Sequence, residues 1–222
     1  EKLTSLTGAK PEIIAHDLHP QFLSTRVAQE LAEESGAVLC PVQHHRAHIT
    51  AVTQEEVVGI AVDGVGYGDD ATIWGGEILA GDPLNGYARC GHLEPVLMPG
   101  GDLATQFPER MLYGILPTEE IRSLLQSRGW SEGSLKILSQ MVERRFNSPV
   151  TTSTGRVLDA AAALLGICRE HTYDGEPSMT LEAYASRGVA QPMDISIHTS
   201  ADGAYVLSTS ALLLEAYSMM ED

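Results

Sequence analysis

Residues 57–68 read VVGIAVDGVGYG, and this stretch decides the fold. An apolar run typical of a buried strand reaches Asp63 and passes directly into a glycine-rich segment. An Asp-Gly pair alone is also typical of a plain hairpin turn. The alternating glycines 64, 66 and 68 exceed what such a turn requires. We therefore expect a strand that ends before Asp63, and then a turn in which Gly64, Gly66 and Gly68 let the backbone approach a bound ligand.

A histidine-rich segment, QHHRAH at 43–48, precedes that strand. If this segment is helical, His44 and His48 lie one turn apart on one face, where they can hold one metal ion. A histidine pair can equally be a solvated helix face. Asp63 favours the metal site, because a buried acid at a strand end needs a partner, and two imidazoles with a carboxylate suit iron or zinc. His45 points elsewhere on such a helix and is the candidate for proton transfer.

A second candidate site begins at 151–156, which read TTSTGR before an Ala/Leu-rich helical stretch. Hydroxyls and glycine at a helix start can simply cap the helix. The other interpretation is a nucleotide site, in which the helix N-terminus faces a phosphate and Asp159 meets ribose hydroxyls. The residues alone leave both interpretations open.

Composition limits the function classes. The net charge is -16, with 14 Lys and Arg, which argues against a large nucleic-acid footprint. No apolar run reaches the roughly 18 residues of a membrane span. The three cysteines lie far apart, which excludes a structural zinc finger within these residues and fits a reducing cytoplasm. We expect a cytoplasmic protein with neither a nucleic-acid partner nor a membrane.

The remaining pattern alternates between strands and helices. Strands are predicted at 12–16, 37–40, 57–62, 71–80, 87–97, 193–198 and 204–208, and helices at 22–32, 43–53, 103–116, 118–128, 133–146, 154–168, 179–187 and 211–220. This order predicts an α/β fold with a mixed sheet. Residues 1–98 form the expected sheet-rich lobe, and 99–222 form a mainly helical part with a hairpin. An aspartate-glycine turn between such strands is the phosphate-loop arrangement of actin-like and ribonuclease-H-like folds.

With these motifs in place, the chain resembles the C-terminal carbamoyltransferase region of the HypF family of hydrogenase maturation proteins. The matching strings occur in family order over nearly the whole chain. They are 16–20, 23–25, 42–48, 63–68, 72–77, 99–102, 153–165 and 179–185. The same domain type is similar to TsaD-type tRNA-modifying proteins and to antibiotic O-carbamoyltransferases.

The resemblance implies an actin-like fold with mixed sheets and an incomplete second lobe. It also implies carbamoyl transfer from ATP-derived carbamoyl-adenylate to the C-terminal cysteine of a HypE-like acceptor, which leads to the cyanide ligand of nickel–iron hydrogenase. His44, His48 and Asp63 would hold a divalent metal, either iron or zinc. The adenylate pocket would be lined by Gly64, Gly66, Gly155 and Asp159.

The chain departs from the family pattern in two respects. The family usually has three consecutive histidines where Arg46 follows His44 and His45. The YrdC-like domain, and a downstream segment that supplies the last metal ligand, do not occur in these residues. We therefore expect a fragment or a short relative. The alternatives are an actin-like ATP-dependent kinase or ATPase, which would not need the histidine pair, and a truncated, non-catalytic nucleotide- or partner-binding module.

Overall fold

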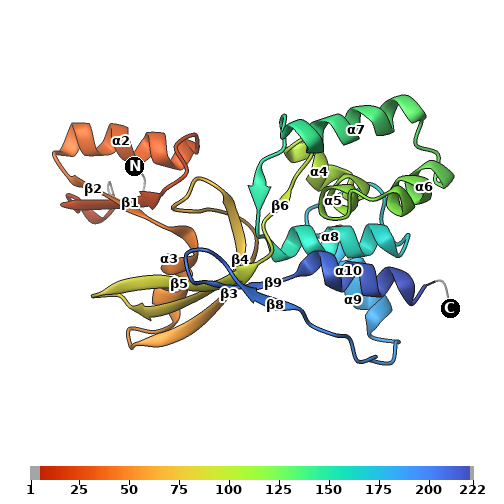
Figure 1. Cartoon of the computed structure of the whole chain (residues 1–222). Coiled ribbons are helices and arrows are strands. Elements are labelled where there is room, and N and C mark those ends of the chain that lie inside the picture. The colour runs from red at the N-terminus through yellow and green to blue at the C-terminus, as the bar shows by residue number, and fades with distance from the viewer. Residues whose placement is uncertain (1–5, 221–222) are drawn as a thin grey trace.

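The computed structural model describes residues 6–220. It opens with a strand–helix–strand unit, β1 (Ile13–Asp17), α2 (Leu23–Ser35) and β2 (Val38–Val42), whose two strands pair in parallel. The helix ends at Gly36, which has a left-handed φ of 73° that favours glycine. In Figure 1 this unit lies at one end of the molecule, and the chain leaves it through α3 toward the larger sheet.

Helix α3 (His44–Val52) carries the histidine-rich segment, as predicted. The helix begins at Gln43, whose side-chain oxygen accepts a hydrogen bond from the Arg46 amide. Ile49 is buried on the face that packs against the sheet. A Cβ at Gly59 would lie only 2.5 Å from Ile49 Cδ1, so the missing side chain lets helix and strand approach closely. This contact holds the first turn of α3 beside the next strand.

Three long antiparallel strands form the centre of the larger sheet: β3 (Val57–Tyr67), β4 (Ile73–Asp82) and β5 (Gly86–Leu93). Within residues 6–220 this sheet has seven strands, in the order β6-β7-β4-β5-β9-β8, with β3 paired to β4. The short strands are β6 (Val96–Leu97), β7 (Val150–Thr151), β8 (Ile197–Thr199) and β9 (Tyr205–Leu207). Because β9 runs parallel to β5 and β8 antiparallel to β9, the predicted mixed sheet is confirmed.

The prediction of a turn at the glycine-rich segment is wrong. Strand β3 continues through Asp63 to Tyr67, and its pairing with β4 shifts register between Val62 and Gly66. A bulge therefore absorbs the glycines, and the chain reverses one step later, where the Gly68 amide donates to the Thr72 carbonyl at 2.9 Å. The bulge, rather than a turn, carries Asp63 and Gly64 out of regular pairing.

Helices gather on the other side of the molecule, as Figure 1 shows. They are α4 (Asp102–Gln106), α5 (Pro108–Ile115), α6 (Glu119–Ser127), α7 (Glu132–Arg144), α8 (Thr154–Leu164), α9 (Glu176–Ala185) and α10 (Thr209–Ser218). The largest core cluster joins α5 and α8, where Leu112, Ala160 and Leu164 are fully buried. None of the helices within residues 6–220 combines the length and the apolar character that crossing a bilayer would require.

The prediction of a single helix at 103–116 is wrong as well. It is divided at Phe107, which has φ -116° and ψ 88°. The following Pro108 disfavours helical dihedrals at the residue before it, and it starts α5 at a position where a missing amide costs nothing. The short helix α4 is thereby free to turn toward the start of α8.

Candidate metal and nucleotide site

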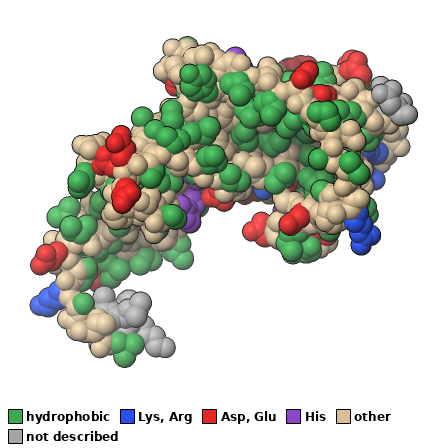
Figure 2. All heavy atoms as spheres, turned by 90° about the horizontal axis from the view of Figure 1, so that it is seen from below, with side chains coloured by type: hydrophobic (Ala, Val, Ile, Leu, Met, Phe, Trp, Pro, Cys, Tyr) green, Lys and Arg blue, Asp and Glu red, His purple; other side chains and the backbone are tan. Residues whose placement is uncertain are grey.

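The first turn of α3 lies between two acids, one at the end of β1 and one in the bulge of β3. His44 Nδ1 is 3.2 Å from Asp17 Oδ2, at the end of β1, and His44 Nε2 is 3.0 Å from Asp63 Oδ2, in the β3 bulge. His48 Nε2 lies 3.2 Å from His44 Nε2. The structure thus brings together the three residues predicted as metal ligands. Figure 2 shows histidine side chains next to acidic ones near the middle of the face in view.

The donor atoms in this cluster fit a small divalent ion in chemistry and in spacing. Bonds of about 2.0–2.1 Å to histidine and carboxylate place neighbouring ligands roughly 2.9–3.4 Å apart. The His44–Asp63 and His44–His48 separations fall in that range. In the present conformation the side chains contact one another, and among the described residues no group of three or more His, Cys, Asp or Glu stands ready to hold an ion. Binding therefore requires small side-chain rotations.

Asp17 lies in the segment 16–20, one of the strings on which the family resemblance rests. A carboxylate on the second nitrogen of a metal-binding histidine fixes the tautomer and the ring orientation. Asp17 occupies that position on His44. Asp17 also accepts from the His19 amide at 2.8 Å, so its carboxylate is held in place. The parallel pairing of β1 with β2, with Asp17 opposite Val42, is what carries it to the start of α3.

His45 points away from His44 and into the protein. It is 1% exposed, and its Nδ1 lies 3.1 Å from Gln43 Nε2. The Gln43 amide is oriented by its bonds to the Arg46 amide and the Tyr67 carbonyl, so Nε2 donates to His45 Nδ1. The ring proton of a neutral His45 is therefore on Nε2, which faces Asp63 Oδ2 at 3.7 Å. Burial, followed by the nearby His44, lowers the pKa of His45, which favours this neutral form.

This placement bears on the role predicted for His45. The side chain is enclosed by Gly66, at which a Cβ would lie 2.4 Å from His45 Cε1. His45 is not among the residues that line the cavity beside Asp63. Its position behind Asp63 favours support of that carboxylate over direct contact with a substrate.

The three glycines of the 57–68 stretch have different surroundings: Gly64 lies in the bulge, Gly66 pairs with Trp74, and Gly68 follows the end of β3. Gly66 faces the His45 ring, and a Cβ at Gly68 would lie 2.2 Å from Trp74 Nε1, so both glycines make room for side chains of this chain. Gly64 differs, because a Cβ there would meet only Arg156 Nη2, at an ordinary 3.8 Å. Neither packing nor a positive φ requires glycine at 64. Gly64 lines a cavity, and Gly66 and Gly68 are not among the residues that line it.

That cavity has a volume of about 520 Å³ and lies between the β3 bulge, α4, and the starts of α8 and α9. Small-molecule sites in proteins are typically about 300–1,000 Å³. Four of the residues predicted for metal or nucleotide binding line it: Asp63, Gly64, Gly155 and Asp159. The start of α8 lies close to the bulge. A Cβ at Gly155 would be only 2.8 Å from Gly64 Cα, so the absence of a side chain at Gly155 permits this approach. The glycines therefore form one wall.

The wall at α8 also carries a buried charge pair. Asp159 is 2% exposed, and its Oδ2 lies 3.1 Å from Arg156 Nη2 without a hydrogen bond of good geometry. Burial raises the pKa of Asp159 to about 6, although Arg156 opposes the shift. The carboxylate and guanidinium both line the cavity, where Arg156 can meet an anionic group and Asp159 a hydroxyl. The sequence reasoning singled out Asp159 but not Arg156.

Ser153 connects the two halves of the site. Its hydroxyl lies 2.9 Å from the Asp63 carbonyl and 2.7 Å from the Gly64 carbonyl, to which it donates. The same oxygen accepts from the Arg156 amide and caps α8, as the hydroxyl-rich sequence predicted. The capping and the nucleotide interpretations of this segment are compatible. The Ser153 hydroxyl that caps α8 also binds the backbone of Asp63 and Gly64, two residues that line the cavity.

Two family models match adjacent parts of the chain. Residues 1–55 match the family model described as HypF Kae1-like domain. Residues 59–222 match the model described as Carbamoyltransferase, Kae1-like Domain, second subdomain. The two matches together take in the histidine segment, the β3 bulge and the start of α8.

Similar proteins are much longer than this chain. The probable carbamoyltransferase HypF of Methanocaldococcus jannaschii is 44% identical over 220 residues, which cover 95% of this chain and 28% of that protein. Carbamoyltransferase HypF2 of Cupriavidus necator is 41% identical over 188 residues, which cover 82% of this chain and 23% of that protein. This chain therefore spans less than a third of the length of either relative.

Solved structures confirm the mixed α/β fold. The crystal structure of full-length HypF in the phosphate- and nucleotide-bound form superposes with a TM-score of 0.86 at 31% identity, covering 98% of this chain and 28% of that one. The crystal structure of T. kodakarensis HypF gives a TM-score of 0.82 at 33% identity, covering 95% of this chain and 29% of that one. By sequence and by fold, the chain belongs to the HypF carbamoyltransferase family, within its Kae1-like domain.

Proposed function

We propose that this chain carries the carbamoyl-transfer site of a HypF-type protein. The observation that supports this most directly is the double position of Asp63. One carboxylate oxygen faces His44, and the residue also lines the cavity that contains Gly155 and Asp159. A metal held by His44, His48 and Asp63 would therefore border a ligand in that cavity. This arrangement favours carbamoyl transfer over the phosphoryl transfer or ATP hydrolysis of an actin-like kinase or ATPase, which would not need the histidine pair.

The metal proposed for the histidine cluster is divalent iron or zinc. When bound, it would supply a Lewis acid that polarises the carbonyl of the carbamoyl group. The chain's own residues support the ligands: Asp17 holds the His44 ring, and His45 lies behind Asp63, with its Nε2 3.7 Å from Asp63 Oδ2 and without a hydrogen bond to it.

The cavity is proposed to hold the adenylate part of carbamoyl-adenylate. Gly64 and Gly155 leave the backbone accessible, Arg156 faces the phosphate, and Asp159 accepts from ribose hydroxyls. Further carboxylates on the cavity wall, Asp102 and Asp174, also suit hydroxyl and amine donors. A ligand with a single phosphate suits this wall better than a highly charged triphosphate does, because carboxylates there outnumber the guanidinium.

The nucleophile is proposed to come from a partner, the C-terminal cysteine of a HypE-like acceptor. Its thiolate sulfur forms a bond to the carbamoyl carbon while the bond from that carbon to the phosphate oxygen breaks. The products are a protein thiocarbamate and AMP. Among the described residues, no cysteine lines the cavity. Cys168 is buried, and burial raises the pKa of its thiol, so it makes a poor nucleophile.

Metal binding can be tested directly on this chain. Zinc or ferrous iron bound after dialysis is measured for the wild type and for the His44→Ala/His48→Ala double variant. His198→Ala, an exposed histidine on β8, serves as the matched control. We expect the wild type and the control to retain metal and the double variant to lose it. Equal metal content in all three proteins would refute the metal site.

Nucleotide binding is tested separately by calorimetry with AMP. We expect heat of binding for the wild type and a loss of affinity in Arg156→Ala, since the guanidinium faces the cavity. Arg144→Ala, at the end of α7, is the control for removing a positive charge. Absence of binding at millimolar AMP in the wild type would contradict the nucleotide part of the proposal.

A further inference from the structure

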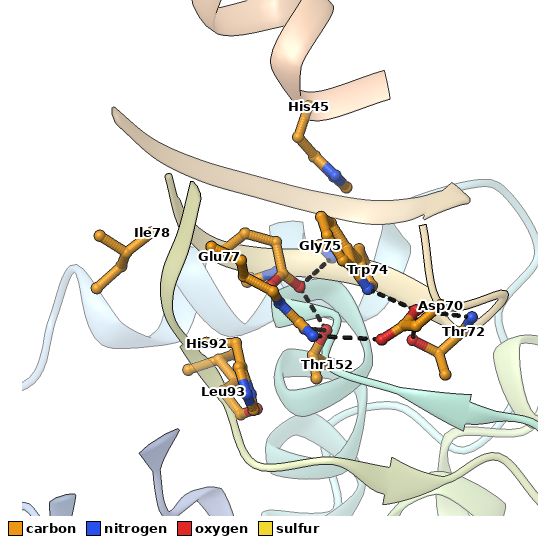
Figure 3. Close-up of polar contacts among 12 residues, drawn as sticks. His45, Asp70, Thr72, Trp74, Gly75, Glu77, Ile78, His92, Leu93 and Thr152 are labelled. Atoms are coloured by element: carbon orange, nitrogen blue, oxygen red, sulfur yellow. Dashed lines mark hydrogen bonds and ion pairs between the residues drawn. The ribbon is translucent and has the colours of Figure 1, made fainter. Parts of the chain in front are cut away.

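A fully buried acid lies beneath the candidate site and takes no part in the chemistry proposed above. Glu77, on β4, is 0% exposed. One oxygen accepts from Arg89 Nε at 2.6 Å, and the other accepts from the Thr152 hydroxyl and from the Gly75 and Gly76 amides. Figure 3 shows Glu77 on β4 with Gly75 and Thr152, the latter from the segment before α8.

One arm of this cluster reaches the histidine helix. The Arg89 guanidinium lies 4.2 Å from the Trp74 ring centroid, so it makes a cation–π contact. Trp74 in turn lies nearly parallel to the His45 ring, with centroids 6.4 Å apart. The Trp74 indole N–H donates to Asp70 at 2.9 Å, which fixes the ring in its plane. Through these contacts Glu77 and Arg89 hold the surface on which His45 rests.

The other arm reaches Asp63 through the backbone. Thr152, which donates to Glu77, is followed directly by Ser153, whose hydroxyl holds the carbonyls of Asp63 and Gly64. A Cβ at Gly75 would lie 2.5 Å from the Asp63 carbonyl oxygen, so β4 itself touches the bulge. The bulge is therefore held on one side by the residues that Glu77 binds and on the other by His45.

Stability alone does not explain an ion pair at this depth. Removing two charges from water costs several kcal/mol, and well-packed apolar residues often stabilise a core as well or better. Directional bonds from one carboxylate to two strands and a helix start do what apolar packing cannot, because they fix relative positions. A bulge leaves its extra residue without a partner in the ladder, so the side chains there depend on support from neighbouring elements.

We infer that Glu77 is a positioning residue that sets the Asp63 carboxylate toward His44, acting through Thr152–Ser153 and through Arg89–Trp74–His45. The inference rests on the proposed metal role of Asp63 for its functional meaning. Its structural content stands by itself. The Gly64 amide donates to Asp63 Oδ1 at 2.6 Å, so protection of that amide reports the orientation of the carboxylate.

The test compares Glu77→Gln and Thr152→Val with Glu109→Gln. Glu109 is a matched control, because it is also a buried acid, 3% exposed, with arginine and tryptophan partners, but on α5. Amide hydrogen exchange of the metal-free proteins is measured at Gly64 and along α7. Co²⁺ titration, followed by its visible ligand-field absorption, measures the cluster at a temperature well below unfolding.

We expect all three variants to unfold at lower denaturant concentration than the wild type. Only Glu77→Gln and Thr152→Val should speed exchange at Gly64, by roughly tenfold or more, and shift or weaken the Co²⁺ spectrum. If Gly64 exchange and Co²⁺ binding change no more in these two than in Glu109→Gln, the positioning role is overturned. If the wild type binds no Co²⁺, the metal proposal fails, and Gly64 exchange alone still decides whether Glu77 orients Asp63.

Discussion

Asp159 offers the sharpest quantitative prediction, because its buried carboxylate is ionised at a cost. Its pKa is raised from 3.8 to about 6, mainly by burial and against the attraction of Arg156. A carboxyl whose pKa is raised on folding favours the folded state while protonated. Its contribution is complete below the unfolded pKa and is lost as the pH rises through the folded pKa. The Asp159→Asn variant removes this titration and keeps the shape.

The magnitude follows from the two pKa values. The shift corresponds to about 3 kcal/mol over the full titration, at 1.36 kcal/mol per unit. Between pH 4.5 and 7.5 the linkage relation gives about 2 kcal/mol. The difference in unfolding free energy, variant minus wild type, should therefore rise by about 2 kcal/mol over this window and level off above the folded pKa. Any constant effect of leaving Arg156 unpaired drops out of the slope.

Urea unfolding followed by tryptophan fluorescence measures both proteins across the window. Ser178→Ala, which changes a non-titrating side chain on the same cavity wall, is the control and should show no such rise. A difference that stays flat with pH, or falls, would show that Asp159 is not the buried, ionisation-resistant group described above. Ribose hydroxyls that bind the ionised carboxylate lower the folded-state pKa of Asp159, so saturating AMP should flatten the fall of wild-type stability with rising pH.

Three glycine substitutions test the assignments within the site. Gly64→Ala should keep wild-type stability and lose AMP affinity in calorimetry, because a Cβ there meets no close neighbour but enters the cavity; unchanged affinity would contradict this. Gly66→Ala should lower the unfolding free energy by about 1–3 kcal/mol in urea titrations, because its Cβ would overlap the His45 ring, and a neutral effect would refute that packing. Gly155→Ala should lower both the unfolding free energy and the affinity for AMP, because its Cβ would press on the Gly64 backbone. A change in only one of these two quantities would show that the Gly155–Gly64 contact does not serve both packing and the cavity wall.

Much of this fold follows from local pattern. Alternation, caps and glycine breaks place most strands and helices within a few residues, and the i, i+4 histidines do share the start of α3. The two errors have different physical origins. Whether the segment after Val62 turns or bulges depends on its pairing with β4, and that pairing is decided by residues many positions away. The break at Phe107 has a local signal, because Pro108 disfavours helical dihedrals at the residue before it.

The candidate site shows the same division. His44 and His48 have i, i+4 spacing, so their proximity on one helix could be predicted from the sequence, and the structure places Asp63 beside His44. Asp17 acquires its role only when β1 and β2 pair and bring their carboxyl ends to α3. Gly66 and Gly68 carry the same local signal as Gly64, yet they serve His45 and Trp74. A glycine pattern reveals close approach but does not say what approaches.

Asp63 shows why the metal cluster and the cavity should act together. Its Oδ1 accepts from the Gly64 amide, and its Oδ2 faces His44. The carbonyls on either side of that amide are bound by Ser153, which caps the helix that lines the cavity. A ligand that moves the start of α8 must therefore act on the peptide that orients the carboxylate, and an ion that turns the carboxylate must act on the same peptide. Thermodynamic linkage makes this influence reciprocal. If bound metal raises the affinity for nucleotide by a given factor, bound nucleotide should raise the affinity for metal by the same factor.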